Sequence, residues 1–408
     1  MSEMIYLDNA ATSFPKPAVV HDFMRDFYRE NGVNPGRTGC DLAICAEEMI
    51  HGTRRELSAF FNASLVREGK SKDPNRMVFT LNATMSLNLV VNGLVRTGDH
   101  IVTTVLEHNS VIRPVNHKVR DGAQATFVRP DGEGYLDPAD IRRAIRPNTK
   151  VVIVNHGSNV TGVVQDLQAI GAVCREAGVP LAIDAAQTAG VVPLDMHACH
   201  VSFLAFTGHK GLFGPTGTGG LCVADDAEIE SSIYGGTGVR SASPLHLTEY
   251  PYRLEAGTLN LAGIAGLRAG LEWIEERGVD AIRRHELNLM AELQAGLEAI
   301  DGVTLIGTRN LERRVATLSF TVAGYDPSDV GTILDVDYGI LTRTGLQCAP
   351  LIHEHHGTTP RGTVRASIGP FNTSAHMRAM VEAVAAIAAD RRASAGIRRA
   401  SPGAVTAS

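Results

Sequence analysis

The sequence lacks an excess of basic residues. Its 38 Lys and Arg are outnumbered by 44 Asp and Glu, and the formal net charge is -6. A nucleic-acid-binding protein normally shows a basic surplus or a basic stripe, and neither is present here. The hydrophobic fraction of 44% is that of an ordinary globular protein. We therefore expect no nucleic-acid partner.

The sequence also lacks a long uninterrupted apolar segment. Gly, Asp, Asn or Arg breaks every apolar stretch before it reaches the length of a transmembrane helix. The first residues, 1–8, have neither the basic start nor the continuous apolar run of a signal peptide. We therefore expect a cytoplasmic protein with no membrane association.

Paired cysteine motifs are absent as well. None of the six cysteines forms a Cys-x-x-Cys pair, which excludes zinc-ribbon and thioredoxin-like sites. In a reducing compartment they remain thiols. Cys348 is the one to which we assign a role below. We expect the other five to be packing or surface residues: Cys40, Cys45, Cys174, Cys199 and Cys222.

Short β-branched runs alternate with helical segments over the first 260 residues. Helices are predicted at 83–95, 138–145 and 166–177. Strands are predicted at 77–80, 100–104, 125–128, 150–155, 179–184, 201–207 and 220–224. This order indicates an α/β domain with a mostly parallel, buried sheet.

After about residue 260 the pattern changes to long helices, at 261–277, 280–300, 327–336 and 374–392, with a strand at 315–322. That pattern predicts a smaller α+β C-terminal domain. We expect a large domain of residues 16–262 and a small domain of residues 1–15 with 263–392. Residues 393–408, rich in Ala, Ser, Gly and Arg, are predicted to form a disordered tail.

Polar residues follow several of the predicted strands. Asp184 ends an apolar strand, Gln187 lies three residues later, and Lys210 comes just beyond another strand. Ligands of parallel α/β sheets bind at the carboxyl ends of strands. The segment 82–84 lies between a strand and a helix, where free N–H groups favour phosphate, and His108 supplies a flat ring.

These residue types are the ones that pyridoxal phosphate (PLP) requires. The cofactor needs a lysine, a carboxylate for the pyridine nitrogen, phosphate donors and a flat neighbour, and an arginine suits the substrate carboxylate. Each feature alone has a commoner structural explanation, such as a helix cap or a turn. The glycine-rich run 211–220 lacks a P-loop ending. Together the features predict a PLP enzyme acting on a small amino acid, with PLP bound to Lys210 as a Schiff base.

The sequence resembles the class V aminotransferase-fold enzymes, and within them the cysteine desulfurases and selenocysteine lyases. The resemblance runs from Tyr6 to about Arg391. It implies the fold type I of PLP-dependent transferases, with a mostly parallel seven-stranded sheet and a smaller α+β domain. The motifs that carry it are Tyr6–Thr12, His156–Gly162, Asp184–Gln187, Thr207–Lys210, Leu254–Thr258, Arg343–Ala349 and Val364–Ser367.

The resemblance implies a role for each site residue. Lys210 forms the Schiff base, Asp184 pairs with the pyridine nitrogen, and His108 stacks on the ring and moves protons. The residues implied to bind the ring hydroxyl or the phosphate are Gln187, Asn159, Ala83, Thr84, Thr207 and His209. The residues implied to reach the phosphate of a partner subunit, and hence to require a homodimer, are Gly257 and Thr258.

The resemblance also implies how the substrate is held. Arg365 is expected to clamp the carboxylate of L-cysteine or a related sulfur or selenium amino acid, and Arg343 and Asn159 are expected to contribute to substrate binding. A planar guanidinium fork suits a carboxylate.

Cys348 is the residue implied to receive the sulfur. In desulfurases a thiolate attacks the substrate sulfur and becomes a persulfide, and alanine leaves. A thiolate needs electropositive surroundings, which Arg343 can supply. Leu346 and Gln347 stand where desulfurases with a compact cysteine loop often carry two histidines. A nearby acid or base is therefore missing, and the acceptor of the sulfur, including a possible acceptor protein, is left open.

Two other functions remain open. A carbon–sulfur or selenocysteine lyase would use the same site for elimination without a protein persulfide, giving pyruvate and ammonia from a sulfur substrate. The third hypothesis is a non-catalytic sulfur-relay or scaffold protein. The presence of Lys210, Asp184 and Arg365 argues against it.

Two further features have no assigned role. Arg37 either helps to bind substrate or anchors its loop. The run 353–356, His-Glu-His-His, suggests a metal site but lacks the His-Glu-x-x-His spacing. We favour a polar loop at the mouth of the active site and predict no metal.

Overall fold

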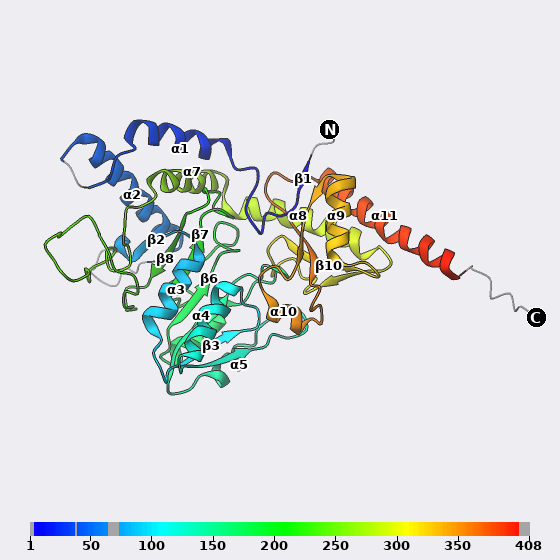
Figure 1. Cartoon of the computed structure of the whole chain (residues 1–408), viewed down its shortest axis with the longest axis horizontal. Helices are drawn as coiled ribbons and strands as arrows, with labels where there is room; N and C mark the ends of the chain where they lie inside the picture. Colours follow the sequence, from blue (N-terminus) through cyan, green and yellow to red (C-terminus); the bar gives the residue numbers. More distant parts are fainter. Residues whose placement is uncertain (1–3, 37–38, 64–72, 400–408) are drawn as a thin grey trace, which may run out of the picture.

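The computed structural model describes residues 4–36, 39–63 and 73–399. They form a large and a small domain, which lie side by side (Figure 1). In this described part of the chain, no helix is both long and apolar enough to span a membrane.

The large domain is built on a seven-stranded sheet with the order β2-β8-β7-β6-β5-β3-β4. Strand β8 pairs antiparallel with β2 and β7, and the other pairs are parallel. The mostly parallel seven-stranded sheet predicted from the sequence is therefore confirmed. The strands are β2 (Met77–Thr80), β3 (His100–Thr104), β4 (Gln124–Val128), β5 (Thr149–Asn155), β6 (Leu181–Asp184), β7 (Phe203–Thr207) and β8 (Gly219–Val223).

Both faces of this sheet are buried under helices. In β5, Val151 and Ile153 pack into one hydrophobic core while Val152 and Val154 pack into the other, as the period of two in a strand requires. One core contains residues of α3 (Ala83–Leu94) and α4 (Asn109–Arg120). The other contains residues of α2 (Asp41–Phe60), α5 (Pro138–Ala144), α6 (Leu167–Glu176) and α7 (Leu261–Arg277), and α1 (Ala18–Asn31) packs on α7.

The small domain has an antiparallel sheet with the order β12-β13-β10-β9. A separate parallel pair joins β1 (Ile5–Tyr6) to β11 (Ile340–Leu341), which brings the N-terminal segment into this domain. The remaining elements are β9 (Val303–Ile306), β10 (Thr317–Val322), β12 (Arg343–Gly345), β13 (Thr363–Ser367), α8 (Val279–Glu298), α9 (Pro327–Tyr338), α10 (Pro350–His355) and α11 (Ser374–Arg399).

The core packing bears on the predicted domain boundary at 262/263. Leu267 and Ile274 of α7 and Ile282 at the start of α8 belong to the core of the large domain, whereas Leu289 further along α8 belongs to that of the small domain. Figure 1 shows α8 leading from one domain to the other. We therefore propose a boundary within α8, later than the sequence pattern suggested.

The predicted disordered tail, 393–408, begins too early. Helix α11 continues to Arg399, so residues 393–399 are helical. This stretch is rich in Ala and Arg, which are among the strongest helix formers, and the composition alone did not reveal that preference. The rest of the predicted tail, 400–408, lies outside the described residues.

A buried ion pair fastens α2 to the sheet. Arg54 Nη1 lies 2.7 Å from Glu255 Oε1, and both side chains are almost fully buried. Glu255 Oε1 also accepts a hydrogen bond from the Phe79 backbone N–H at 2.7 Å, and the Arg54 guanidinium lies over the Phe79 ring. Removing one charge would leave the other buried without compensation.

We therefore predict that Glu255→Gln lowers the free energy of unfolding by about 3 kcal/mol, because Arg54 keeps its charge and loses its counter-ion. The measurement is urea-induced unfolding of the full chain. Asp22→Asn, which breaks the exposed pair with Arg25, is the control and is expected to leave the midpoint unchanged. Equal midpoints for Glu255→Gln and the unsubstituted chain would contradict the prediction.

Candidate active site

Asp184 and Lys210 lie at the carboxyl edge of the large sheet. Asp184 is the last residue of β6, almost fully buried, and is paired in register with Asn155 of β5 and Ala205 of β7. Lys210 follows β7. Burial lowers the pKa of Lys210 to about 8, and the negative charge of Asp184 acts in the opposite direction. An amine with a lowered pKa is more readily neutral, the form that attacks a carbonyl group.

A segment from the N-terminus fixes the peptide that precedes Lys210. The carbonyl oxygen of His209 accepts hydrogen bonds from the Ser13 backbone N–H at 3.2 Å, from Thr12 Oγ1 at 3.0 Å and from Lys16 Nζ at 3.0 Å. His209 also contacts Thr12 through Nδ1, at 3.1 Å. The sequence analysis did not anticipate this arrangement, because the segment is almost 200 residues from Lys210 in the chain.

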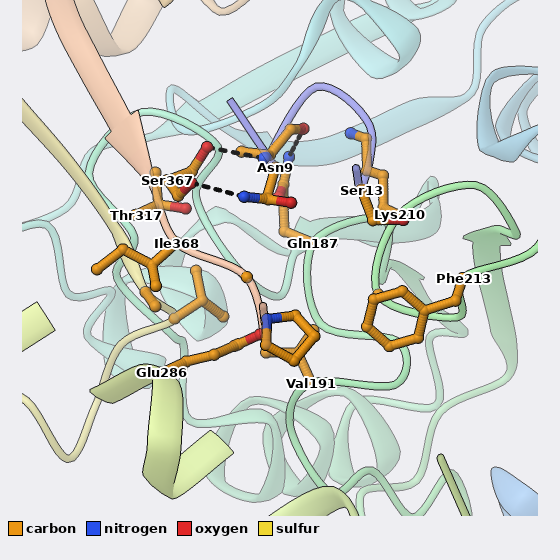
Figure 2. A pocket seen from close by; sticks show the side chains of 16 residues that line it. Asn9, Ser13, Gln187, Val191, Lys210, Phe213, Glu286, Thr317, Ser367 and Ile368 are labelled. Atoms are coloured by element: carbon orange, nitrogen blue, oxygen red, sulfur yellow. Dashed lines mark hydrogen bonds between the residues drawn. The ribbon is translucent and has the colours of Figure 1, made fainter. Parts of the chain in front are cut away.

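Lys210 is one of the residues that line a pocket between the two domains. Figure 2 shows Lys210 beside Ser13, with Ser367 and Thr317 of the small domain also lining the cavity. Gln187, from the large domain, also lines it and donates from Nε2 to the carbonyl oxygen of Ala10 at 3.0 Å. Residues from both domains therefore surround the predicted cofactor lysine.

Three of the predicted phosphate-binding residues, Ala83, Thr84 and Thr207, lie at or near the start of α3. Ala83 is buried and Thr84 exposed in its first turn, where backbone N–H groups have no partner within the helix. Thr207 pairs in register with Gly219 of β8. A Cβ atom at Gly219 would lie 2.7 Å from the Cα of Asn82, so only glycine allows β8 to approach the helix this closely.

His108 stands at the start of α4 as its N-cap. Its Nδ1 accepts a hydrogen bond from the Ser110 backbone N–H at 3.1 Å and lies 2.9 Å from Ser110 Oγ. Burial lowers the pKa of His108, while the charge of Asp184 acts to raise it. The ring is therefore held by one nitrogen and kept neutral near pH 7.

Cys348 lies at the tip of a tight turn from the small domain. The Ala349 N–H donates to the Leu346 carbonyl at 2.9 Å, and the two central residues, Gln347 and Cys348, have φ values of 41° and 60°. These are left-handed conformations that residues other than glycine rarely adopt. The Cys348 side chain is exposed, and its carbonyl oxygen accepts the Asn109 N–H of α4 at 2.8 Å.

Gln347 holds that turn in place through hydrogen bonds of its side chain and its backbone. Its side chain is buried and donates from Nε2 to the Thr363 carbonyl at 3.0 Å, and its backbone carbonyl accepts from Asn159 Nδ2 at 2.7 Å. Gln347 Oε1 lies 2.9 Å from His353 Nε2. Gln347, at a position where desulfurases with a compact cysteine loop often have a histidine, therefore stabilises the turn, a role that the sequence did not show.

The run 353–356 was predicted to form a polar loop, but it lies at the end of helix α10, and His353 takes part in the same network. His353 is almost fully buried and contacts Gln347 and Thr358 through its two ring nitrogens. Burial lowers its pKa to about 4. Across the described part of the chain, no group of three or more His, Cys, Asp or Glu side chains is arranged to hold a metal ion.

Arg365, on strand β13, is buried. Its Nη1 donates to the Asn159 carbonyl at 3.0 Å and its Nη2 contacts Asp8 Oδ1 at 2.5 Å. Arg343 is the residue directly opposite Arg365 on β12, and it is exposed. Opposite residues of an antiparallel pair point to the same face, so the two guanidinium groups share one side of the small sheet.

Asn159 and Arg365 each have one side-chain atom that lacks a hydrogen-bond partner among the described residues. These atoms are Asn159 Oδ1 and Arg365 Nε, and both are buried. A buried polar atom without a partner is costly, so these two atoms suit a ligand with complementary groups. A carboxylate, an N-terminal helix turn for phosphate, a flat neutral ring and a lysine fit PLP in charge and in chemistry.

Gly257 and Thr258 lie apart from the predicted site residues around Lys210. Both are exposed and line a separate cavity with Arg54 and Glu255. Within one chain they therefore do not reach the Lys210 site. Arg37, which had two alternative roles, lies outside the described residues.

Comparison with known proteins gives the family. Residues 5–380 match the family model of the class V aminotransferases. A probable cysteine desulfurase of Methanothermobacter thermautotrophicus is 35% identical over 396 residues, which is 95% of this chain and 96% of the relative. The apo structure of a cysteine desulfurase from Thermococcus onnurineus superimposes with a TM-score of 0.88 at 34% identity, covering 95% of both chains.

A more distant structure belongs to a carbon–sulfur lyase. The cystine C–S lyase C-DES, in complex with its product cysteine persulfide, gives a TM-score of 0.79 at 25% identity over 94% of this chain and 98% of the lyase. Another structure of C-DES contains glycine covalently linked to its PLP cofactor. The predicted fold class and cofactor are thus confirmed, and the chain belongs to the class V aminotransferase family, within its PLP-dependent cysteine desulfurases.

Proposed function

We propose that the chain converts L-cysteine to L-alanine and receives the sulfur on Cys348. The substrate Cβ–S bond breaks, an S–S bond forms on Cys348, and the hydrogen of the Cys348 thiol is balanced by the new hydrogen on the alanine Cβ. The observation that carries this proposal is the exposed thiol on a turn anchored to α4. Cys348 also lies close enough to Lys210 to interact with it electrostatically.

PLP, when bound, withdraws electrons from the substrate Cα and so weakens bonds at Cα and Cβ. Lys210 is the residue that holds the cofactor and then moves the Cα proton at its Nζ. Asp184 keeps the pyridine nitrogen protonated, and the neutral ring of His108 covers the flat face. These assignments are proposals, and the shared location of the three residues at the sheet edge supports them.

Arg365 is the proposed anchor for the substrate carboxylate, with Asn159 and Arg343 beside it. One N–H of Nη1 and one of Nη2 already bind Asn159 and Asp8, and the N–H of Nε is unused among the described residues. A carboxylate can bind bidentately to Nε and the remaining N–H of an Nη atom. Asp8 would then hold the guanidinium in place from the other side.

The chain is proposed to act as a homodimer in the cytoplasm. The exposed position of Gly257 and Thr258, away from Lys210, suits residues that complete the phosphate site of a partner subunit. An exposed Cys348 also suits transfer of sulfur to an acceptor protein.

Elimination is the second candidate function, favoured by the likeness to the lyase C-DES. From L-cysteine such a reaction releases hydrogen sulfide, pyruvate and ammonia, and it needs no thiol of the protein. The two functions are therefore separated by their products from L-cysteine, alanine or pyruvate.

For Cys348→Ala we predict at least about a 100-fold loss of alanine formation under reducing conditions, because the sulfur has no nucleophile to receive it. Bound PLP, measured by its absorbance, is expected to be unchanged. Cys45→Ala, which removes another exposed thiol, is the control and is expected to retain activity. Undiminished alanine formation by Cys348→Ala would exclude the persulfide role, and pyruvate as the main product of the unsubstituted chain would favour elimination.

Replacing Arg365, the proposed anchor of the substrate carboxylate, should weaken substrate binding more than cofactor binding. Arg365→Lys keeps the charge but loses the planar fork, so we predict that KM for L-cysteine rises by about 10-fold or more while PLP content stays the same. Arg361→Lys, an exposed arginine beside Asp326, is the matched control. An unchanged KM in Arg365→Lys would show that the carboxylate binds elsewhere.

A further inference from the structure

Ser110 lies between two of the proposed active-site residues. Its Oγ is 2.9 Å from His108 Nδ1 and 3.4 Å from Asp184 Oδ2, and its side chain is buried. Its backbone N–H donates to the same Nδ1 at 3.1 Å. One residue therefore contacts the ring nitrogen of His108 with two groups and the carboxylate of Asp184 with one of them.

The chemistry of these groups limits where the protons can be. A ring nitrogen that accepts a backbone N–H carries no proton, and its single lone pair is shared when a second donor lies within reach. Neutral His108 therefore has its proton on Nε2. The Ser110 hydroxyl has a single proton, which it can donate to His108 Nδ1 or to Asp184 but not to both. The shorter distance favours Nδ1, which reinforces the same tautomer.

We propose that Ser110 is a positioning residue that fixes the His108 ring by Nδ1, keeps its proton on Nε2, and ties its orientation to Asp184. The inference rests on the proposed function in one respect, since it gives His108 a defined proton to exchange at Nε2 during the reaction. Second contacts of this kind set the tautomer and orientation of functional histidines.

Four charged groups act on the His108 ring. Asp184 of β6 favours protonation, while Lys210 beyond β7, Arg113 of α4 and Arg365 of β13 disfavour it. The Ser110 hydroxyl adds a donor to the unprotonated nitrogen, and a donor there stabilises the neutral ring. Loss of the hydroxyl should therefore raise the pKa of His108.

A purely structural role would give a different outcome. If Ser110 only helped to begin α4, its hydroxyl could be removed with a loss of stability but no change in the titration of His108. The backbone N–H that donates to His108 at the start of the helix would remain in Ser110→Ala and in Ser110→Thr. The protonation of His108 is therefore the measurement that separates the two roles.

The test compares Ser110→Ala with Ser110→Thr, which retains a hydroxyl, in the full-length protein with and without PLP. Thr53→Val removes a buried hydroxyl that donates to Met49 in α2, away from the site, and serves as the control. Histidine-selective ¹⁵N NMR, assigned with His108→Gln, reports the tautomer and the pKa of His108. Steady-state kinetics with L-cysteine gives kcat and KM.

In Ser110→Ala we expect the pKa of His108 to rise by about 0.5 units or more and the Nε2–H tautomer to lose part of its dominance. We also expect kcat to fall about 10-fold with KM within about 2-fold. Ser110→Thr and Thr53→Val should behave like the unsubstituted chain. An unchanged His108 titration in Ser110→Ala, or a Thr variant that behaves like the Ala variant, would overturn the proposal.

These outcomes are separate from those that test the proposed function. If the unsubstituted chain forms pyruvate in place of alanine, desulfuration fails as the function, while the NMR titration still decides whether Ser110 controls His108.

Discussion

The hydrogen bond from the Asn109 N–H to the Cys348 carbonyl, 2.8 Å long, joins the two halves of the candidate active site. It connects the first residue of α4 in the large domain to the cysteine turn of the small domain. His108 and Ser110 flank Asn109, so the start of one helix orients the ring, the contact to Asp184 and the thiol-bearing turn. The turn is otherwise strained, with two left-handed residues, and depends on such contacts to persist.

The N-terminal segment connects the site on its other side. Asp8 pairs with Arg365 in the small domain, and Thr12, Ser13 and Lys16 hold the carbonyl that precedes Lys210 in the large domain. A single short segment therefore sets how far the proposed carboxylate anchor lies from the proposed cofactor lysine. Such fixed geometry matters because a bound substrate reacts efficiently only when its reacting atoms are correctly placed.

The residues at strand ends could be predicted from sequence, because the carboxyl ends of parallel strands share one edge and apolar runs mark those strands. Asp184 and Lys210 are examples, and the sheet and the family are confirmed. Ser110 and Gln347 could not be assigned, because their partners lie 74 and 16 residues away and neither residue type signals such a contact. The extension of α11 past residue 392 was missed, because low complexity outweighed helix propensity in the interpretation.

The central claim is that the sulfur of L-cysteine passes to Cys348. Its most direct test is a single turnover with one equivalent of L-cysteine and no reductant, followed by mass spectrometry of the peptide that contains residue 348. The account predicts one added sulfur atom on Cys348 and one equivalent of alanine. An unmodified Cys348 together with pyruvate would contradict it.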